Sequence, residues 1–165
     1  MCGIAGFIDF NKRTADGILH KMTDILQHRG PDGDGHFTDT TDYAVTGLGH
    51  RRLSIIDLSN AASQPMQFES LYIVFNGEIY NYNEIREELI AKGHHFSTHS
   101  DTEVILHAYK EWGNKCIDRL IGMFAFVIYD KLQQIIFCVR DRAGVKPFFW
   151  YYKNGLFLFA SELKA

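Results

Sequence analysis

A cysteine directly follows the initiator methionine, and its chemistry depends on that position. If Met1 were removed, Cys2 would carry both a thiol and a free α-amine. An α-amine has an unperturbed pKa of roughly 8 and a thiol one of about 8.5, so near neutral pH the amine can accept the thiol's proton without a second side chain. Cys2 is small, which favours removal of Met1. A cysteine at position 2 is weak evidence by itself, and its meaning depends on the residues that could act with it.

Hydrolysis of an amide by a thiolate also requires hydrogen-bond donors for the developing oxyanion. Asn76 and Gly77 follow a buried apolar stretch, so a side-chain amide and a backbone N–H from adjacent residues could converge on an oxyanion at a strand end. Asn-Gly is also the commonest hairpin dipeptide, and local sequence alone favours a turn at this position. The two interpretations predict different local structures.

Other charged residues could hold the ends of a substrate. Arg52 lies among apolar residues, and a substrate carboxylate bound by both prongs of its guanidinium would suit it. An internal ion pair with Asp57 or Glu78 is the competing interpretation, whereas Arg51 should point the opposite way, toward solvent. Asp101 could bind a substrate ammonium, although the helix dipole already favours a carboxylate in the first turn of a helix.

Two further patterns in the sequence indicate neither a metal site nor a phosphate-binding loop. His94, His95 and His99 fit no zinc spacing, so we expect exposed loop histidines and no metal. The glycine-rich segment 30–35 lacks the lysine and hydroxyl residues of a phosphate loop. It predicts a mobile loop that could close over a substrate.

The composition is that of one globular domain in a reducing compartment. The chain has 165 residues, 46% hydrophobic and 22% charged, with a net charge of −3. Its basic residues are dispersed among acidic ones, which argues against a nucleic-acid or anionic membrane partner. No apolar run approaches the roughly 18 residues of a membrane span, and no signal peptide is evident. The three cysteines form no disulfide pattern, and Cys116 and Cys138 look like buried hydrophobes. We therefore expect a cytoplasmic location.

The periodicity predicts strands, then helices, then strands, an order that favours a layered α+β fold. Strands are expected over Gly3–Asp9, Tyr43–Leu48, Arg52–Asp57, Leu71–Phe75, Met123–Tyr129, Gln134–Arg140, Pro147–Tyr152 and Leu156–Ala160. One helix is expected to begin at a cap formed by Thr14, and its apolar residues at helical spacing are Ile18, Leu19, Met22, Ile25 and Leu26. Two more helices are expected over 82–92, opened by Asn81, and over 101–112, opened by a capping box from Ser100 to Glu103. A strand over residues 3–9 would place Cys2 at the end of a sheet.

Taken together, these residues resemble the glutaminase domain of class II glutamine amidotransferases, which are N-terminal-nucleophile hydrolases. The resemblance covers residues 1–165 and is specific to the type found in glutamine-hydrolysing asparagine synthetases. The segment Met1–Gly6 alone would fit several class II enzymes, including those that make glucosamine phosphate or phosphoribosylamine. Six further segments, in order, resemble the asparagine synthetase group: His28–Asp32, Arg52–Asp57, Asn76–Asn81, Ser100–Glu103, Gly122–Phe126 and Phe159–Glu162.

The resemblance implies a four-layer αββα sandwich and a function for each candidate residue. Cys2, freed of Met1, would attack the side-chain amide of glutamine, and the resulting thioester would hydrolyse to glutamate. The implied site is Cys2, Asn76 and Gly77 for catalysis and Arg52, Glu78 and Asp101 for glutamine binding, with no metal. In the family, the released ammonia travels through a tunnel to a second active site.

The resemblance also implies a larger protein. In the family, an ATP-pyrophosphatase domain that uses Mg-ATP to activate aspartate follows the glutaminase domain, and residues 1–165 do not include it. The expected partners are therefore glutamine and that synthetase domain, and no cofactor is expected in this domain. The glutaminase domain should run somewhat past Ala165, so its last sheet or helix could be incomplete. The sequence leaves monomer and homodimer open.

Two alternative functions remain open at this point. The same glutaminase chemistry could supply ammonia to another acceptor, such as a sugar or a carboxylate in surface polysaccharide synthesis. If Met1 were retained, the nitrogen of Cys2 would be tied up in an amide, and the chain could be a non-catalytic docking domain.

Overall fold

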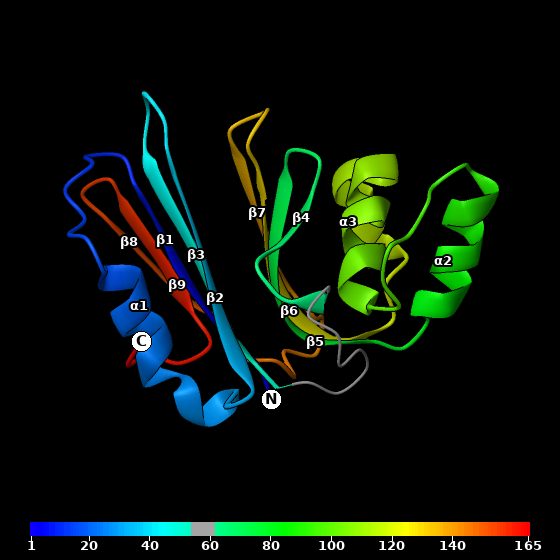
Figure 1. Cartoon of the computed structure of the whole chain (residues 1–165), viewed down its shortest axis with the longest axis horizontal. Coiled ribbons are helices and arrows are strands. Elements are labelled where there is room, and N and C mark those ends of the chain that lie inside the picture. Colours follow the sequence, from blue (N-terminus) through cyan, green and yellow to red (C-terminus); the bar gives the residue numbers. More distant parts are fainter. Residues whose placement is uncertain (54–61) are drawn as a thin grey trace.

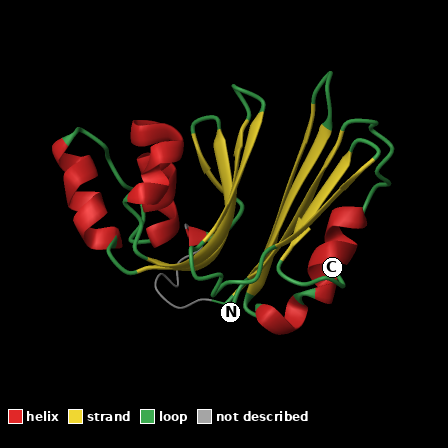
Figure 2. Cartoon of the chain, turned by 180° about the vertical axis from the view of Figure 1, so that it is seen from behind, coloured by secondary structure: helices red, strands yellow, loops and turns green. Residues whose placement is uncertain are grey.

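Four layers make up the computed structural model, with two β-sheets packed face to face and helices on the outer face of each sheet (Figure 1). The structure describes residues 1–53 and 62–165. The same layers are visible from behind in Figure 2, where the helices flank the two sheets on opposite sides. The prediction of an α+β fold with an αββα sandwich is therefore confirmed.

The first sheet is antiparallel, and its central strand carries the N-terminus. In spatial order it contains β2 (Gly33–Thr40), β3 (Val45–Arg52), β1 (Gly3–Asp9), β9 (Leu156–Ala160) and β8 (Phe149–Lys153). All seven residues of β1 are buried. A Cβ atom at Gly6 would lie 2.3 Å from both Gly47 O and the Phe159 ring, so glycine is required for the close packing of this strand. Cys2 therefore precedes a rigid, fully buried strand, as predicted.

The second sheet is also antiparallel and has a short edge strand. It contains β4 (Met66–Phe68), β5 (Leu71–Ile79), β6 (Gly122–Asp130) and β7 (Ile135–Arg140), in that order. β5 pairs with β6 along its whole length, from Leu71 opposite Asp130 to Ile79 opposite Gly122. β4 pairs only with the first three residues of β5. Most of one edge of β5 is therefore not covered by β4.

The helices cover the outer faces of the sheets. α1 (Ile18–Ile25) and the 3₁₀-helix η1 (Gln27–Arg29) lie beside the first sheet. α2 (Tyr82–Ala91), α3 (Asp101–Trp112) and the 3₁₀-helix η3 (Gly113–Asp118) belong to the side of the second sheet. Apolar side chains fill each space between layers, and those between the two sheets include Ile4, Leu48, Val74, Val127 and Phe159. Among the helices of the described residues, none is long and apolar enough to cross a membrane.

Some sequence predictions about strands are wrong. The expected mobile loop over residues 30–35 is instead partly regular, because β2 begins at Gly33 and pairs with β3. Asn76 and Gly77 do not form a turn and lie within β5. β4 was not predicted, since three residues are too few to show a period. The strand predicted over Arg52–Asp57 overlaps β3 only at Arg52, and its residues 54–57 lie outside the described part of the chain.

Two helix caps also differ from the prediction. The N-cap of α1 is Gly17, in a left-handed conformation with φ of 78°, and Thr14 Oγ1 instead donates to Asp9 Oδ2 at 2.7 Å. Ser100 does cap α3, because its side chain accepts a hydrogen bond from Thr102 N at 3.0 Å. The reciprocal bond of a capping box is absent among the described contacts of Glu103, whose carboxylate accepts from Ser97, Thr98 and the Thr98 hydroxyl.

Candidate active site

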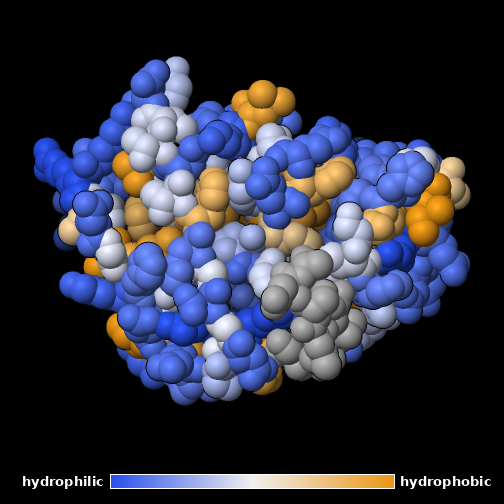
Figure 3. Space-filling view, viewed as in Figure 1, coloured by the Kyte–Doolittle hydropathy of each residue, from blue (hydrophilic) through white to orange (hydrophobic). Residues whose placement is uncertain are grey.

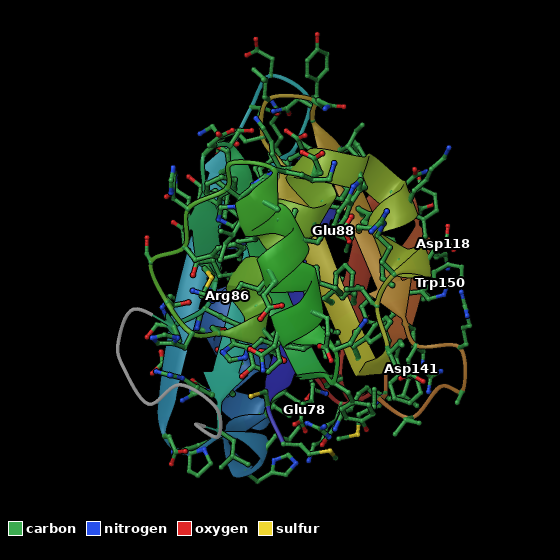
Figure 4. All side chains as sticks on the ribbon, turned by 90° about the vertical axis from the view of Figure 1, so that its right-hand side faces the viewer. Glu78, Arg86, Glu88, Asp118, Asp141 and Trp150 are labelled. Carbon is green, nitrogen blue, oxygen red and sulfur yellow. The ribbon has the colours of Figure 1, made fainter. Side chains whose placement is uncertain are left out.

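One cavity brings together all the residues predicted to form the site. It has a volume of about 450 Å³, which is in the range of roughly 300–1,000 Å³ typical of small-molecule sites. Its lining includes Cys2, Arg52, Asn76, Gly77, Glu78 and Asp101. Figure 4 shows Glu78 at the lower end of the molecule, the same end at which Figure 1 places the N-terminus. The cavity therefore lies at the end of the sandwich from which β1 starts.

The backbone of Cys2 is held by a charged side chain from η1. Arg29 Nε donates to Cys2 O at 3.0 Å, and Arg29 Nη1 binds Glu162 Oε1 at 2.9 Å. His28 Nε2 contacts the same carboxylate oxygen at 2.9 Å. The Arg29 hydrogen bond, together with those from His28 and Lys164, lowers the pKa of Glu162 to about 2. Cys2 is thus fixed by a short chain of ionic contacts that joins η1 to the segment after β9.

The thiol of Cys2 lies against the peptide of Leu53. Leu53 N donates to Sγ at 3.3 Å, and the thiol donates to Leu53 O at 3.5 Å. Burial raises the pKa of Cys2, while the Leu53 hydrogen bond and the nearby positive charges act in the opposite direction. The thiol is therefore protonated at rest and needs a base before it can attack.

Met1 is present in this structure and occupies part of the cavity lining. Its sulfur accepts a hydrogen bond from Lys146 Nζ at 3.1 Å, and the Lys146 side chain is buried. The nitrogen of Cys2 is here a peptide nitrogen and not a base. In this form Cys2 therefore lacks the free α-amine that the expected chemistry requires.

Asn76 and Gly77 present two donors on one strand. Tyr80 N donates to Ile121 O, so the backbone N–H and C=O groups of even-numbered residues of β5 are directed toward β6. Those of the odd-numbered residues face the opposite edge of β5. Gly77 N–H is therefore directed to the edge that β4 does not reach. The Asn76 side chain is buried, and its Nδ2 has no hydrogen-bond partner among the described residues. A buried amide without a partner is costly unless a ligand or water completes it.

Opposite charges lie at different parts of the cavity wall. Arg52, at the end of β3, is half-buried, and Asp101, at the start of α3, is buried. Asp101 Oδ2 accepts a hydrogen bond from Ile79 N at 3.0 Å. Burial raises the pKa of Asp101 to about 6, and the nearby charge of Glu78 adds to the rise. A guanidinium and two carboxylates in one cavity can hold the carboxylate and ammonium of an α-amino acid.

Three further residues of the cavity wall were not predicted from the sequence: His50, Gln64 and Lys146. His50 precedes Arg52 by two residues on β3, so strand alternation could have placed both on one face. Gln64 precedes β4, and no pattern in the sequence indicates it. Lys146 lies in the segment between β7 and β8, where the sequence offers no distinguishing signal.

Two expectations outside the cavity differ from the structure, one of them only in part. Arg51 does not point into solvent, because Nε donates to Thr23 O at 3.1 Å and the guanidinium also pairs with Asp24. Of the three histidines expected to be exposed, His95 and His99 are exposed, whereas His94 is half-buried and contacts His107, with 2.9 Å between their Nδ1 atoms. Among the described residues, no group of histidine, cysteine, aspartate or glutamate side chains is arranged to hold a metal ion.

Comparisons with known proteins agree with this geometry. Residues 1–165 match the family model of the glutamine amidotransferase domain. Asparagine synthetase [glutamine-hydrolyzing] 3 of Bacillus subtilis is 42% identical over 100% of this chain, and asparagine synthetase [glutamine-hydrolyzing] 1 of the same organism is 45% identical over 100%. A putative asparagine synthetase 2 of Methanocaldococcus jannaschii is 42% identical over 99% of this chain. The chain spans only 27%, 26% and 34% of the length of these relatives, respectively.

A solved structure shows the same fold at low sequence identity. Glutamine phosphoribosylpyrophosphate amidotransferase from B. subtilis superposes with a TM-score of 0.77 and 22% identity, over 97% of this chain and 42% of that one. The likeness identifies the N-terminal-nucleophile hydrolase fold. Together with the family match over the whole chain, it shows that this protein belongs to the glutamine amidotransferase domain family, in the type that glutamine-hydrolysing asparagine synthetases carry.

Proposed function

We propose that the domain hydrolyses glutamine to glutamate and ammonia, with Cys2 as the nucleophile after removal of Met1. The observation that carries this proposal is the convergence of Cys2, the unsatisfied Asn76 amide and the Gly77 N–H on a cavity that also holds opposite charges. No cofactor is needed for this reaction, because all its proton transfers can be made by the nucleophile's own amine and by water.

The reaction proceeds through a thioester. The α-amine of Cys2 accepts the thiol proton, and the sulfur forms a bond to the amide carbon of glutamine. The tetrahedral intermediate collapses as the amine returns the proton to the leaving nitrogen, and the C–N bond breaks to release ammonia. A water molecule then attacks the thioester, the amine takes the water's proton, and the C–S bond breaks to give glutamate and the free thiol.

The cavity wall supplies binding and electrostatic stabilisation for these steps. Asn76 Nδ2 and Gly77 N–H donate to the oxygen that becomes negative in both tetrahedral intermediates. Arg52 binds the α-carboxylate of glutamine with two parallel hydrogen bonds, and Asp101, with Glu78, binds the α-ammonium. These contacts place the side-chain amide of glutamine next to Cys2.

We further propose that the ammonia is used to amidate aspartate in a separate ATP-dependent domain of a larger protein. The relatives named above are asparagine synthetases, and this chain covers about a quarter to a third of their length. Mg-ATP would be required in that second domain only. The three cysteines of this chain are not paired in disulfides, which fits a reducing cytoplasm.

The test is a glutamate-release assay with purified protein whose loss of Met1 has been verified by intact mass. Cys2→Ala should abolish release, because neither Cys116 nor Cys138 lines the cavity. Cys138→Ala is the matched control, since Cys138 lies on β7 outside the cavity, and it should retain wild-type activity. Undiminished release by folded Cys2→Ala protein would refute the glutaminase mechanism. Formation of asparagine from aspartate and Mg-ATP by the full-length protein tests the acceptor separately.

A further inference from the structure

Two side chains occupy the position that a neighbouring strand would take beside Phe75. Gln64 Oε1 accepts a hydrogen bond from Phe75 N at 2.6 Å, and His50 Nε2 lies 3.2 Å from Phe75 O. Both backbone groups face away from β6, as the alternation along β5 requires. The peptide groups of Phe75 are therefore satisfied by side chains from two other parts of the chain.

The strand ladder stops just before this point. β4 begins at Met66, which pairs with Ile73, and its pairing with β5 does not continue before Met66. Continuing the same register would place Gln64 opposite Phe75. Gln64 bonds there through its side chain, and its Nε2 donates to Thr102 Oγ1 at 3.3 Å, in the first turn of α3. Gln64 thus joins the edge of β5 to the helix that carries Asp101.

His50 is suited to hold a carbonyl group. A carbonyl oxygen only accepts hydrogen bonds, so Nε2 must carry the imidazole proton. The side chain is 1% exposed, and burial lowers the pKa of His50 to about 3, which keeps the ring neutral near pH 7. Its Nδ1 has no hydrogen-bond partner among the described residues.

These contacts surround the donor that the reaction uses. Phe75 is pinned by His50 and Gln64, and Ile79 N–H is taken by Asp101 at 3.0 Å. Gly77 lies midway between these two fixed positions and faces the same edge. The edge is thus closed on both sides of Gly77, and no described residue binds the N–H of Gly77 itself.

We propose that His50 and Gln64 are positioning residues for the oxyanion hole, which hold the Phe75 peptide so that Asn76 and Gly77 are aimed at the substrate oxygen. This inference rests on the proposed glutaminase reaction. Neither side chain needs to touch the reacting atoms. Displacement of a donor by a fraction of an ångström weakens a hydrogen bond to a developing charge more than it weakens ground-state binding.

The test compares two inhibitors that depend on the oxyanion hole to different degrees. With the γ-aldehyde analogue of glutamine, the α-amine of Cys2 takes the thiol proton, the sulfur forms a C–S bond to the aldehyde carbon, and the C=O π bond breaks, so that its oxygen carries the electron pair and is bound by the two donors. Glutamate forms no bond to Cys2 and develops no oxyanion, so its binding depends mainly on its α-carboxylate and α-ammonium. Damage to the oxyanion hole should therefore raise the inhibition constant of the aldehyde much more than that of glutamate.

His50→Leu removes the donor to Phe75 O. We expect kcat and aldehyde affinity to fall together by roughly 10- to 100-fold, somewhat less than the loss of a whole donor, with the glutamate inhibition constant changed by less than about threefold. His50→Gln, whose amide nitrogen can donate in the place of Nε2, should recover most of both. If His50→Leu does not fold, His50→Asn, which is polar but too short to reach Phe75 O, provides the same comparison.

Gln64→Met and Gln64→Glu test the other contact. Gln64→Met leaves Phe75 N–H without its acceptor and should reproduce the His50→Leu pattern. Gln64→Glu keeps an acceptor oxygen and should retain more aldehyde affinity than Gln64→Met.

His107→Leu is the matched control. His107 is also a buried histidine, but it lies outside the cavity lining, so its loss should lower the melting temperature and leave the inhibitor ratio unchanged.

Equal weakening of both inhibitors, or an unchanged kcat in folded His50→Leu and Gln64→Met proteins, would overturn the positioning role. Either result leaves the glutaminase proposal standing, provided the wild type is active and Cys2→Ala is not. An inactive wild type that has lost Met1 would instead overturn the glutaminase proposal, and the positioning inference with it.

Discussion

The burial of Asp101 opposes the charge that the carboxylate needs for its proposed role. It is buried and accepts the Ile79 N–H, yet burial raises its pKa to about 6. In the proposed reaction it binds the α-ammonium of glutamine only when it is ionised. Substrate binding should therefore depend on pH in a range where most aspartates are already fully charged.

We expect kcat/KM for glutamine to fall as pH drops below about 6 because Asp101 becomes protonated, mainly through a rise in KM. Asp101→Asn should have a high KM at all pH values and lack this acid limb. Steady-state kinetics between pH 5 and 8 would measure both. An acid limb that persists in Asp101→Asn would contradict this assignment.

Asp101 affects stability in the opposite direction. Because its pKa is raised in the folded protein, its ionisation lowers the free energy of unfolding as pH rises from 3.8 to about 6.

At the residue scale, the sequence indicated the groups proposed to touch the substrate better than the groups that support them. Cys2, Asn76 and Arg52 could be proposed because their side chains have chemistry that a reaction or a substrate requires. Gln64 could not, because a glutamine is common and its importance comes from a backbone N–H contributed by a distant strand. Support of this kind depends on tertiary register, which one sequence does not reveal.

At the scale of elements, the anchor of the N-terminus is a contact between η1 and the segment after β9. Arg29 and His28 both pair with the carboxylate of Glu162, and Arg29 also donates a hydrogen bond to Cys2 O. The Glu162 side chain is 24% exposed, so solvent weakens these ion pairs, yet their geometry fixes the end of β1.

Glu162→Gln should destabilise the protein at neutral pH and reduce its sensitivity to acid. The pKa of Glu162 is lowered from 4.5 to about 2, so its contribution to stability is fully present above pH 4.5 and is lost as pH falls toward 2. Urea unfolding at pH 7 and pH 3 would measure the change. Glu88→Gln is a suitable control, because its ion pair with Arg119 is exposed and far from Cys2 in sequence. A Glu162→Gln variant that loses as much stability on acidification as the wild type would contradict the prediction.

The sequence predicted long, buried or well-capped elements and missed elements that depend on pairing. β1, β5, β6 and α3 were located because their apolar pattern is long. Residues 30–35 were predicted to be a loop because they are rich in glycine, and pairing with β3 is what makes the part from Gly33 onward a strand. The start of α1 was misplaced because Thr14 binds Asp9, a tertiary contact that competes with capping.

At the scale of the whole molecule, the layers are held together by packing between the two sheets. Phe159 of β9 is 1% exposed and lies in this inner layer with Leu48 and Val127. Its ring fills the space that the missing Cβ of Gly6 leaves open. The outer surface is different: Figure 3 shows mainly hydrophilic residues on this face, with apolar residues visible near its middle.

Phe159→Ala should lower the free energy of unfolding by about 3–5 kcal/mol, because it removes a large buried ring and leaves a cavity between the sheets. Chemical denaturation of the variant and the wild type would measure the difference. Leu132→Ala is the control, since Leu132 is 82% exposed and its truncation should change stability by less than about 0.5 kcal/mol. A similar, small effect for both variants would show that the two sheets do not depend on this contact.

The short length of β4 has a consequence for how such a site can be lost. A sheet edge normally invites another strand, and proteins must prevent that pairing. Here pairing with β4 ends at Ile73, and two side chains close the next position, at Phe75. In the proposed reaction the N–H of Gly77 then binds the substrate. Extending β4 toward the N-terminus, so that backbone groups reached Gly77, would inhibit the reaction by competition while every catalytic side chain stayed in place. The donor proposed for catalysis is thus a backbone N–H that a longer β4 would use for strand pairing.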